Sequence, residues 1–364
     1  MSNSAQLVLV VENDAFLRII QVVLDQSTTD ERRAAFADFF AHDLPDFDGW
    51  CTELRRLASN LYPAEVRLVS SQEELRAQLP GANILVVESL DVGSEELELG
   101  SQLKIVQKYG TILRNIDIEA CKARNVSVTT LQRRANIACA EQTLALMMTL
   151  AKKLNQINGL ISIDQLTAAG YSPTTFDTRH TANSGWARIA GLRMLYESTL
   201  GIIGMGEIGR ELALRAAAFG MKVLYYQRNP LPDSDEQIFH AEFSTIDKLL
   251  GQSDWVSIQL PRGQATRGLI DRTRLWQMKE GACLINTAQG YHVDREALLE
   301  ALHAGRLGGF ALDTLYEEPG RADDELLGFD NVVLTPHTAA QPRFNALNDF
   351  RDMIQGLAAR VSAL

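Results

Sequence analysis

Short apolar runs alternate with amphipathic stretches along most of the chain. Runs of four to six apolar, often β-branched residues predict buried strands, and stretches with apolar residues three and four apart predict helices between them. The expected strands are 7–11, 66–69, 84–88, 103–107, 126–130, 200–203, 223–226, 255–259, 282–286, 308–312 and 332–335. The expected helices are 73–78, 118–124, 138–154, 208–219, 273–278, 295–304 and 346–361. A repeated strand–helix order of this kind predicts an α/β fold with parallel sheets.

Two stretches break this order. Residues 14–63 have a helical, acidic pattern that contains five aromatic residues, namely Phe36, Phe39, Phe40, Phe47 and Trp50. We interpret these as helices packed onto a small domain, with a lid or a subunit contact as the alternative. Residues 155–193 are polar and glycine-rich without a clear period, which predicts a long loop.

Three glycines follow the apolar run 200–203. Gly204, Gly206 and Gly209 have the spacing of a dinucleotide-binding turn between a strand and a helix. In such a turn the first glycine permits a tight bend, the second lets a diphosphate approach the backbone, and the third packs the helix closely on the strand. Glu207 and Ile208 open that helix, whose N-terminal N–H groups favour anions. Gly220 is the expected C-terminal cap.

The end of the next strand bears on the choice of coenzyme. Enzymes that bind NAD usually place Asp or Glu there, against the ribose 2′-hydroxyl. This chain has Gln227, Arg228 and Asn229 instead. Because a neutral amide does not repel a 2′-phosphate and an arginine can pair with one, the sequence favours NADP(H), with NAD(H) as the alternative.

Size and charge exclude several other classes of protein. A chain of 364 residues is expected to form two domains. Because 46 acidic residues outweigh 35 basic ones, the net charge of −11 argues against nucleic acid as a partner. The first apolar run ends at Glu12, too early for a signal peptide, and the most apolar later stretch, 137–151, is too short to span a membrane. Four scattered cysteines indicate neither a metal site nor disulfides, so we expect a cytoplasmic protein without metal.

Motifs in order along the chain identify a resemblance. They are Tyr-Gly-x-x-x-x-Asn-Ile-Asp at 109–117, Ala-Glu-x-Thr-Leu-Ala-Leu at 140–146, Gly-Met-Gly-Glu-Ile-Gly at 204–209, Met-Lys-x-Gly-Ala-x-Leu-Ile-Asn-Thr-Ala at 278–288, Ala-Leu-Asp at 311–313, Glu-Glu-Pro at 317–319 and Asn-Val-Val-Leu-Thr-Pro-His at 331–337. From residue 103 onward the sequence resembles the D-2-hydroxyacid dehydrogenase family, and more loosely before it.

The resemblance implies a two-lobed enzyme that moves a hydride between a nicotinamide and a 2-oxo or 2-hydroxy acid in a cleft between its lobes. A Rossmann-type dinucleotide-binding domain is expected at 134–337, and a smaller flavodoxin-like substrate domain at 1–133 and 338–364. His337 would be the acid–base group and Glu318 its partner carboxylate. Thr287 and Asp313 would flank and hold the nicotinamide. Relatives also imply a homodimer that pairs through the nucleotide domains.

Two parts of the implied substrate site depart from the family pattern. The third catalytic residue is normally an arginine, but Gln289 stands in its place. A neutral hydrogen bond in place of a charge-assisted one forfeits about 1 to 2 kcal/mol per contact. The substrate-binding loop, implied at Gly110, Thr111, Ile112 and Arg114, has Ile112 where a glycine is usual and an extra cation at Arg114. Tyr291 and His292 also replace residues that are usually small or aliphatic.

Three interpretations follow from these departures. In the first, the chain is a hydride-transfer enzyme for a substrate related to 2-oxo acids, with Arg114, Arg133 or Arg134 supplying the missing charge. In the second, it is a nucleotide-binding sensor or corepressor-like protein without turnover. In the third, it is an ordinary dehydrogenase inactivated by the change from arginine to glutamine.

Overall fold

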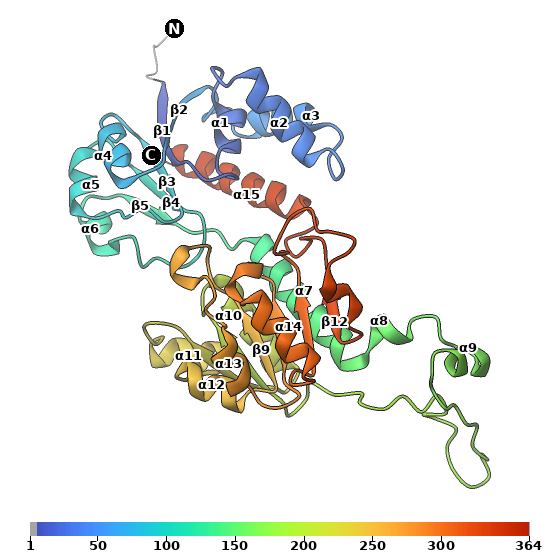
Figure 1. Cartoon of the computed structure of the whole chain (residues 1–364). Helices are drawn as coiled ribbons and strands as arrows, with labels where there is room; N and C mark the ends of the chain where they lie inside the picture. The colour runs from blue at the N-terminus through green and yellow to red at the C-terminus, as the bar shows by residue number, and fades with distance from the viewer. Residues whose placement is uncertain (1–5, 364) are drawn as a thin grey trace. The chain divides into compact units, whose positions relative to one another are not determined.

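The computed structural model describes residues 6–363 and divides into two compact units. Unit 1 comprises Met1–Asn136 and Ala340–Leu364, and unit 2 comprises Ile137–Ala339. In Figure 1 unit 1 runs from blue to cyan and ends in the red helix α15, and unit 2 carries the green to orange segments. The boundaries expected from sequence, after 133 and 337, differ from these by three and two residues.

Unit 1 is built on a parallel sheet of five strands in the order β2-β1-β3-β4-β5. This is the flavodoxin-like order, so the predicted fold of the smaller unit is confirmed. The strands are β1 (Leu7–Glu12), β2 (Ala64–Val69), β3 (Ile84–Val87), β4 (Ile105–Lys108) and β5 (Ser127–Thr129). The helices are α1 (Ile19–Leu24), α2 (Asp30–Phe40), α3 (Phe47–Leu57), α4 (Gln72–Gln78), α5 (Ser94–Leu99), α6 (Ile118–Ala123) and α15 (Phe344–Val361).

Alternate residues of the central strands enter two different cores. On β1, Leu9 and Val11 pack with α1, α3 and α15, and Val10 packs with residues of α4, α5 and α6 on the opposite face. The acidic segment 14–63 forms helices α1 to α3, as predicted, and Phe40, Phe47 and Trp50 join the first core. Phe39 does not, because 36% of it remains exposed.

Unit 2 contains a parallel sheet of seven strands in the order β12-β11-β10-β9-β6-β7-β8. The six strands from β8 to β11 have the Rossmann order, with β6 as the first strand in sequence, and β12 is one further strand at the edge. The predicted doubly wound fold is confirmed. The strands are β6 (Thr199–Ile203), β7 (Lys222–Tyr226), β8 (Ala241–Phe243), β9 (Trp255–Ile258), β10 (Cys283–Asn286), β11 (Gly309–Leu312) and β12 (Val332–Leu334). The helices are α7 (Arg134–Lys152), α8 (Leu154–Ile157), α9 (Ile163–Ala168), α10 (Glu207–Ala218), α11 (Asp233–Phe239), α12 (Ile246–Gln252), α13 (Arg272–Gln277) and α14 (Arg295–His303).

Some short elements and one residue differ from what the sequence predicts. Strand β8 has three residues and helix α11 is mostly polar, so neither shows a clear apolar period. The long loop expected at 155–193 contains the short helices α8 and α9. Phe219, the last residue of the expected helix 208–219, follows α10 and is exposed, whereas Gly220 does take the left-handed φ of +73° expected of a C-terminal cap. Between residues 6 and 363, no helix has both the length and the apolar character needed to cross a membrane.

Candidate functional site

The glycine turn after β6 has the geometry that each of its glycines was expected to provide. Gly204 has a φ of +104°, and a Cβ there would lie 2.3 Å from the Gln259 carbonyl oxygen. A Cβ on Gly209 would lie 2.3 Å from the Gly204 carbonyl oxygen, so helix and turn pack backbone to backbone. A Cβ on Gly206 would meet nothing within 4 Å. Two of the glycines therefore serve packing inside the protein, and the third faces open space.

Helix α10 begins directly at this open position. Gly206 is its N-cap, and no side chain caps the helix there. The N-terminus of an uncapped helix favours an anion, because its first N–H groups lack partners inside the helix and its dipole is positive there. The turn also lies where the order of the sheet reverses, between β9 and β7, which is the usual position of a ligand in such sheets.

The end of β7 lies beside the glycine turn. The Gly204 N–H donates to the Tyr226 carbonyl at 2.9 Å, which places the next residue, Gln227, next to the turn. Gln227 Nε2 donates to the Asn229 carbonyl at 2.7 Å, and Arg228 between them is exposed. No carboxylate occurs among the three residues expected to face the coenzyme ribose.

A buried polar cluster lies at the ends of β9 and β10. Gln259 Nε2 donates to Thr287 Oγ1 at 3.0 Å and to Ser257 Oγ at 2.9 Å, and Thr143 Oγ1 on α7 lies 2.9 Å from Thr287 Oγ1. All four side chains are buried. The cluster fixes Thr287, which was expected near the nicotinamide, but sequence reasoning did not find its three supporting residues.

Gln289 lies in a tight turn after β10. Asn286 holds the turn, because its Oδ1 accepts from the Ala288 N–H at 3.0 Å and its Nδ2 donates to the Gln289 carbonyl at 2.8 Å. The Gln289 side chain is half-buried, and in the part of the chain that the structure describes its amide makes no hydrogen bond. The amide is therefore available to a ligand.

Asp313 at the end of β11 organises the segment that carries His337. Its carboxylate is fully buried and accepts from Thr335 Oγ1 at 2.6 Å, the Thr338 N–H at 3.0 Å and the Ala339 N–H at 2.9 Å. The Asp313 carbonyl accepts from the His337 N–H at 2.9 Å. The role observed for this carboxylate is to hold the loop in place, and contact with a nicotinamide amide stays a prediction.

His337 and Glu318 meet as the resemblance implied. His337 Nδ1 lies 2.9 Å from Glu318 Oε2, and Glu318 Oε1 accepts from the Leu315 N–H at 3.1 Å. Both side chains remain partly exposed, at 46% for the histidine and 37% for the glutamate. The carboxylate thus orients the ring and leaves Nε2 for another partner.

The glycine turn, Thr287, Asp313 and His337 lie at one edge of the sheet of unit 2. Each follows the carboxyl end of a strand, and neighbouring strands of this sheet are parallel. Hydrogen bonds continue along the edge, from the Gln259 N–H to the Ile203 carbonyl at 2.8 Å and from the Asp313 N–H to the Asn286 carbonyl at 3.1 Å. Ligands of open parallel sheets bind at this edge.

His292, which departs from the family pattern, is fully buried beside the Gln289 turn. Neither ring nitrogen makes a hydrogen bond of normal geometry, and the ring packs edge-on against Tyr291 with centroids 4.9 Å apart. Burial lowers the pKa of His292, opposed by the nearby Pro261 carbonyl. The Tyr291 hydroxyl accepts from the Gly263 N–H at 3.1 Å, which ties this turn to the loop after β9.

The implied substrate loop follows β4 in unit 1. Gly110 is buried with a φ of +145°, Ile112 is half-buried, and Thr111 and Arg114 are exposed. The loop therefore offers a cation at Arg114, and Ile112 adds bulk where the family pattern has glycine.

Two of the three arginines considered as a source of positive charge already face carboxylates. Arg134 pairs with Asp349 at 2.9 Å and with Asp352 at 2.7 Å, so its charge is already matched by two carboxylates. Arg133 pairs with Glu88 at 2.9 Å, and burial raises the pKa of that carboxyl despite the cation. Arg114 makes no ion pair within residues 6–363, so it is the remaining candidate.

Comparison with known proteins gives a consistent result. Residues 169–339 match the family model of the D-isomer specific 2-hydroxyacid dehydrogenase NAD binding domain. A glyoxylate reductase from Thermococcus litoralis is 35% identical over 255 residues, which is 70% of this chain and 72% of that protein. A D-3-phosphoglycerate dehydrogenase from Archaeoglobus fulgidus is 33% identical over 84% of this chain, but the match spans only 55% of the relative's length. The crystal structure of the PH0520 protein from Pyrococcus horikoshii covers 84% of this chain and 87% of its own, with a TM-score of 0.56 and 28% identity.

Proposed function

Because the chain belongs to the D-isomer-specific 2-hydroxyacid dehydrogenase family, we propose that it transfers a hydride between NADP(H) and a substrate related to 2-oxo and 2-hydroxy acids. Members of this family are NAD(P)-dependent oxidoreductases. The observation that carries the proposal is the pairing of His337 with Glu318 on the same sheet edge as the glycine turn.

The glycine turn fits a dinucleotide. Gly206 leaves space where a Cβ would point, and the uncapped start of α10 offers N–H groups to a diphosphate. When bound, the nicotinamide coenzyme supplies or accepts the hydride. Thr287, held in place by the buried cluster around Gln259, is the residue we assign to the nicotinamide side of the site.

The residues after β7 support a preference for NADP(H). Gln227 presents a neutral amide beside the turn, so a 2′-phosphate meets no negative charge from this strand end. Arg228 is exposed and makes no ion pair within the described residues, so its guanidinium is available to a phosphate. Tighter binding of NADH than of NADPH would contradict this assignment.

His337 moves the proton of the reaction through Nε2. Because Nδ1 faces the Glu318 carboxylate, we assign a donated hydrogen to Nδ1 and the exchange of protons with the substrate to Nε2. In reduction, Nε2–H donates its proton to the carbonyl oxygen; in oxidation, Nε2 accepts the proton of the hydroxyl group. Glu318 stabilises the imidazolium and keeps the ring oriented throughout.

Gln289 sets the character of the substrate site. Its amide donates a neutral hydrogen bond to a substrate oxygen, where an arginine would form a charged, bidentate contact. The chain therefore gains less from binding a small 2-oxo acid carboxylate than a protein with an arginine there. The same observation favours, as a second candidate, a nucleotide-binding protein without turnover.

A homodimer is the proposed assembly. The segment between α8 and β6 carries α9 and extends from the body of unit 2, in green in Figure 1. Large apolar side chains are exposed on this segment and where it returns to the body, among them Ile161 at 81%, Met194 at 65% and Tyr196 at 59%. A second copy of unit 2 would bury such side chains. Sedimentation velocity should give a dimer for the full chain; a monomer at micromolar concentration would refute this assembly.

One set of assays separates the two candidate functions. Oxidation of NADPH and NADH is followed with glyoxylate and hydroxypyruvate, for the unmodified chain and for Gln289→Arg. Turnover by the unmodified chain, faster with NADPH, supports the proposal. Coenzyme binding without turnover in either protein supports the nucleotide-binding alternative. Turnover in Gln289→Arg alone indicates that the glutamine inactivates an ordinary dehydrogenase.

A further inference from the structure

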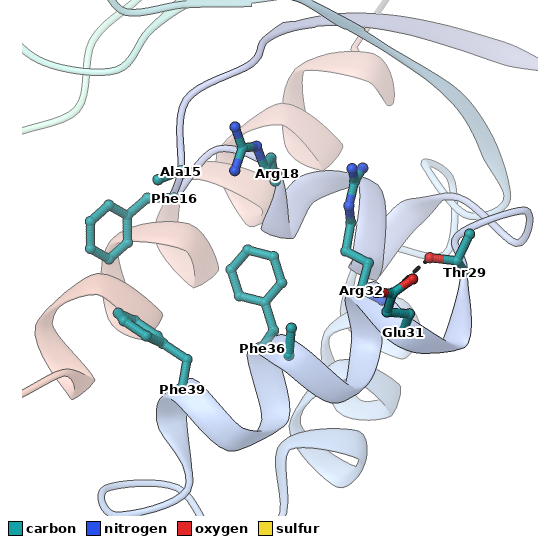
Figure 2. A pocket seen from close by; sticks show the side chains of 9 residues that line it. Ala15, Phe16, Arg18, Thr29, Glu31, Arg32, Phe36 and Phe39 are labelled. Atoms are coloured by element: carbon teal, nitrogen blue, oxygen red, sulfur yellow. Dashed lines mark hydrogen bonds between the residues drawn. The ribbon is translucent and has the colours of Figure 1, made fainter.

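Unit 1 contains a hollow that the proposed function does not use. It has a volume of about 570 Å³ and lies between helix α2 and the segment that follows β1. Its principal lining residues are Phe16, Arg18, Glu31, Arg32, Phe36 and Phe39. Figure 2 shows Phe16 and Phe39 at the left, Phe36 near the middle, and the guanidinium groups of Arg18 and Arg32 above and to the right of Phe36. None of the residues of the implied substrate loop lines it.

The aromatic wall of the hollow is held in place before any ligand binds. Phe16 packs edge-on against Phe39, with centroids 5.8 Å apart, and Phe36 stacks on the buried Phe40 at 6.3 Å. The guanidinium carbon of Arg343, which is not among the lining residues, lies 3.5 Å from the centre of the Phe39 ring. Rings fixed in this way lose little conformational freedom when another ring packs against them.

Two arginines of the lining carry charge without a counterion. Arg18 Nε donates to the neutral Asn13 Oδ1 at 2.7 Å, and Arg32 donates to the neutral Gln21 Oε1. Neither arginine makes an ion pair among the residues that the structure describes. Their neighbour Arg33, which does not line the hollow, is by contrast paired with Asp30 at 2.9 Å. The amides orient Arg18 and Arg32 while leaving their charge for an anion.

We infer that this hollow is a binding site for a small aromatic carboxylate. The volume suits a small organic molecule, an aromatic ring can pack edge-on against the three phenylalanines, and the two guanidinium groups can donate hydrogen bonds to a carboxylate. The arginines would repel a cation. An acid without a ring would leave the aromatic side chains exposed to water. Glu31 is the one acidic side chain of the lining, and it opposes the anion. The site is complete within unit 1 and does not depend on turnover.

Isothermal titration of the full chain with phenylacetate tests this site without a coenzyme. We expect saturable 1:1 binding, with 2-phenylethanol, which lacks the charge, and acetate, which lacks the ring, each at least about tenfold weaker. Arg18→Gln and Arg32→Gln should each weaken phenylacetate binding about tenfold or more, whereas Arg33→Gln, the matched control on the same helix, should leave it unchanged. Glu31→Gln should strengthen it. Circular dichroism and thermal melting establish that each variant is folded.

Three results would overturn the inference. The first is the absence of saturable binding of phenylacetate to the unmodified chain. The second is binding that both Arg18→Gln and Arg32→Gln leave intact, because the ligand would then lie elsewhere. The third is displacement of phenylacetate by saturating glyoxylate, because the ligand would then occupy the substrate site instead. Loss of turnover in the enzyme assays has no bearing on any of these outcomes.

Discussion

Substitution of the three turn glycines by alanine should separate folding from coenzyme binding. Gly206 has a φ of −76°, and a Cβ there would meet nothing within 4 Å of the protein. Alanine is a poorer N-cap than glycine, but it also reduces the freedom of the unfolded chain, and the two effects have opposite signs. We therefore expect Gly206→Ala to change the free energy of unfolding by less than about 1 kcal/mol.

Gly204→Ala and Gly209→Ala should behave differently. At Gly204 the left-handed φ of +104° costs an alanine about 1 to 2 kcal/mol, and overlap with the Gln259 carbonyl adds about 1 to 3 kcal/mol. At Gly209 the overlap is with the backbone of the turn itself, so relief requires the helix to move away from the strand. Both variants should lose about 2 kcal/mol or more of stability.

NADPH binding should be impaired in Gly206→Ala, the variant whose stability we expect to change least. If the diphosphate rests against Gly206, the added methyl group of Gly206→Ala occupies that space, and NADPH affinity should fall about tenfold to a hundredfold at nearly unchanged stability. Denaturant unfolding gives the stability, and quenching of tryptophan fluorescence during NADPH titration gives the affinity. A Gly206→Ala protein that binds NADPH as tightly as the unmodified chain would refute the placement of the diphosphate at this turn.

Three further predictions concern residues around the site and in unit 1. Gln289→Arg should raise kcat/KM for glyoxylate about tenfold, because a charged contact replaces a neutral one, and an unchanged value would show that Gln289 does not face the substrate. Burial lowers the pKa of His292 below its ordinary value of 6.5, so the unfolded chain takes up a proton more readily than the folded protein and stability falls as pH drops below 6.5. Urea unfolding at pH 7.5 and 5.5 should show this loss for the unmodified chain and not for His292→Leu, and an equal loss in both proteins would contradict it. Arg134→Gln should cost about 3 kcal/mol of unfolding free energy at pH 7, because Asp349 is fully buried and loses its cationic partner. Burial raises the pKa of Asp349, so the folded state protonates it more readily and the cost should be smaller at pH 5; equal urea midpoints for the two proteins would contradict this.

Much of the architecture could be predicted because it depends on local pattern. The core strands of both sheets are continuous apolar runs, and a parallel sheet buried on both faces requires such runs. The glycine spacing was equally informative, because Gly204 and Gly209 are required by close backbone contacts that any side chain would obstruct. The pairing of His337 with Glu318 followed from the family resemblance rather than from any property of the two residues alone.

The remaining features depend on residues far apart in the chain. Thr143 and Gln259 are separated by 116 positions, and Arg134 and Asp349 by 215, so neither contact has a local pattern. The hollow beside α2 was also not predicted. Phe40, Phe47 and Trp50 pack the first core of unit 1, but Phe36 and Phe39 line a space that forms only when α2 packs beside the end of β1.

The most direct test of the proposed function is the rate of NADPH-dependent glyoxylate reduction by the unmodified chain and by His337→Asn. If the imidazole at position 337 supplies the proton, kcat should fall by about a hundredfold or more while NADPH affinity stays within about twofold. Glu318→Gln should show an intermediate loss, because it leaves the imidazole but removes the charge that orients it. Undiminished turnover in His337→Asn would contradict the account.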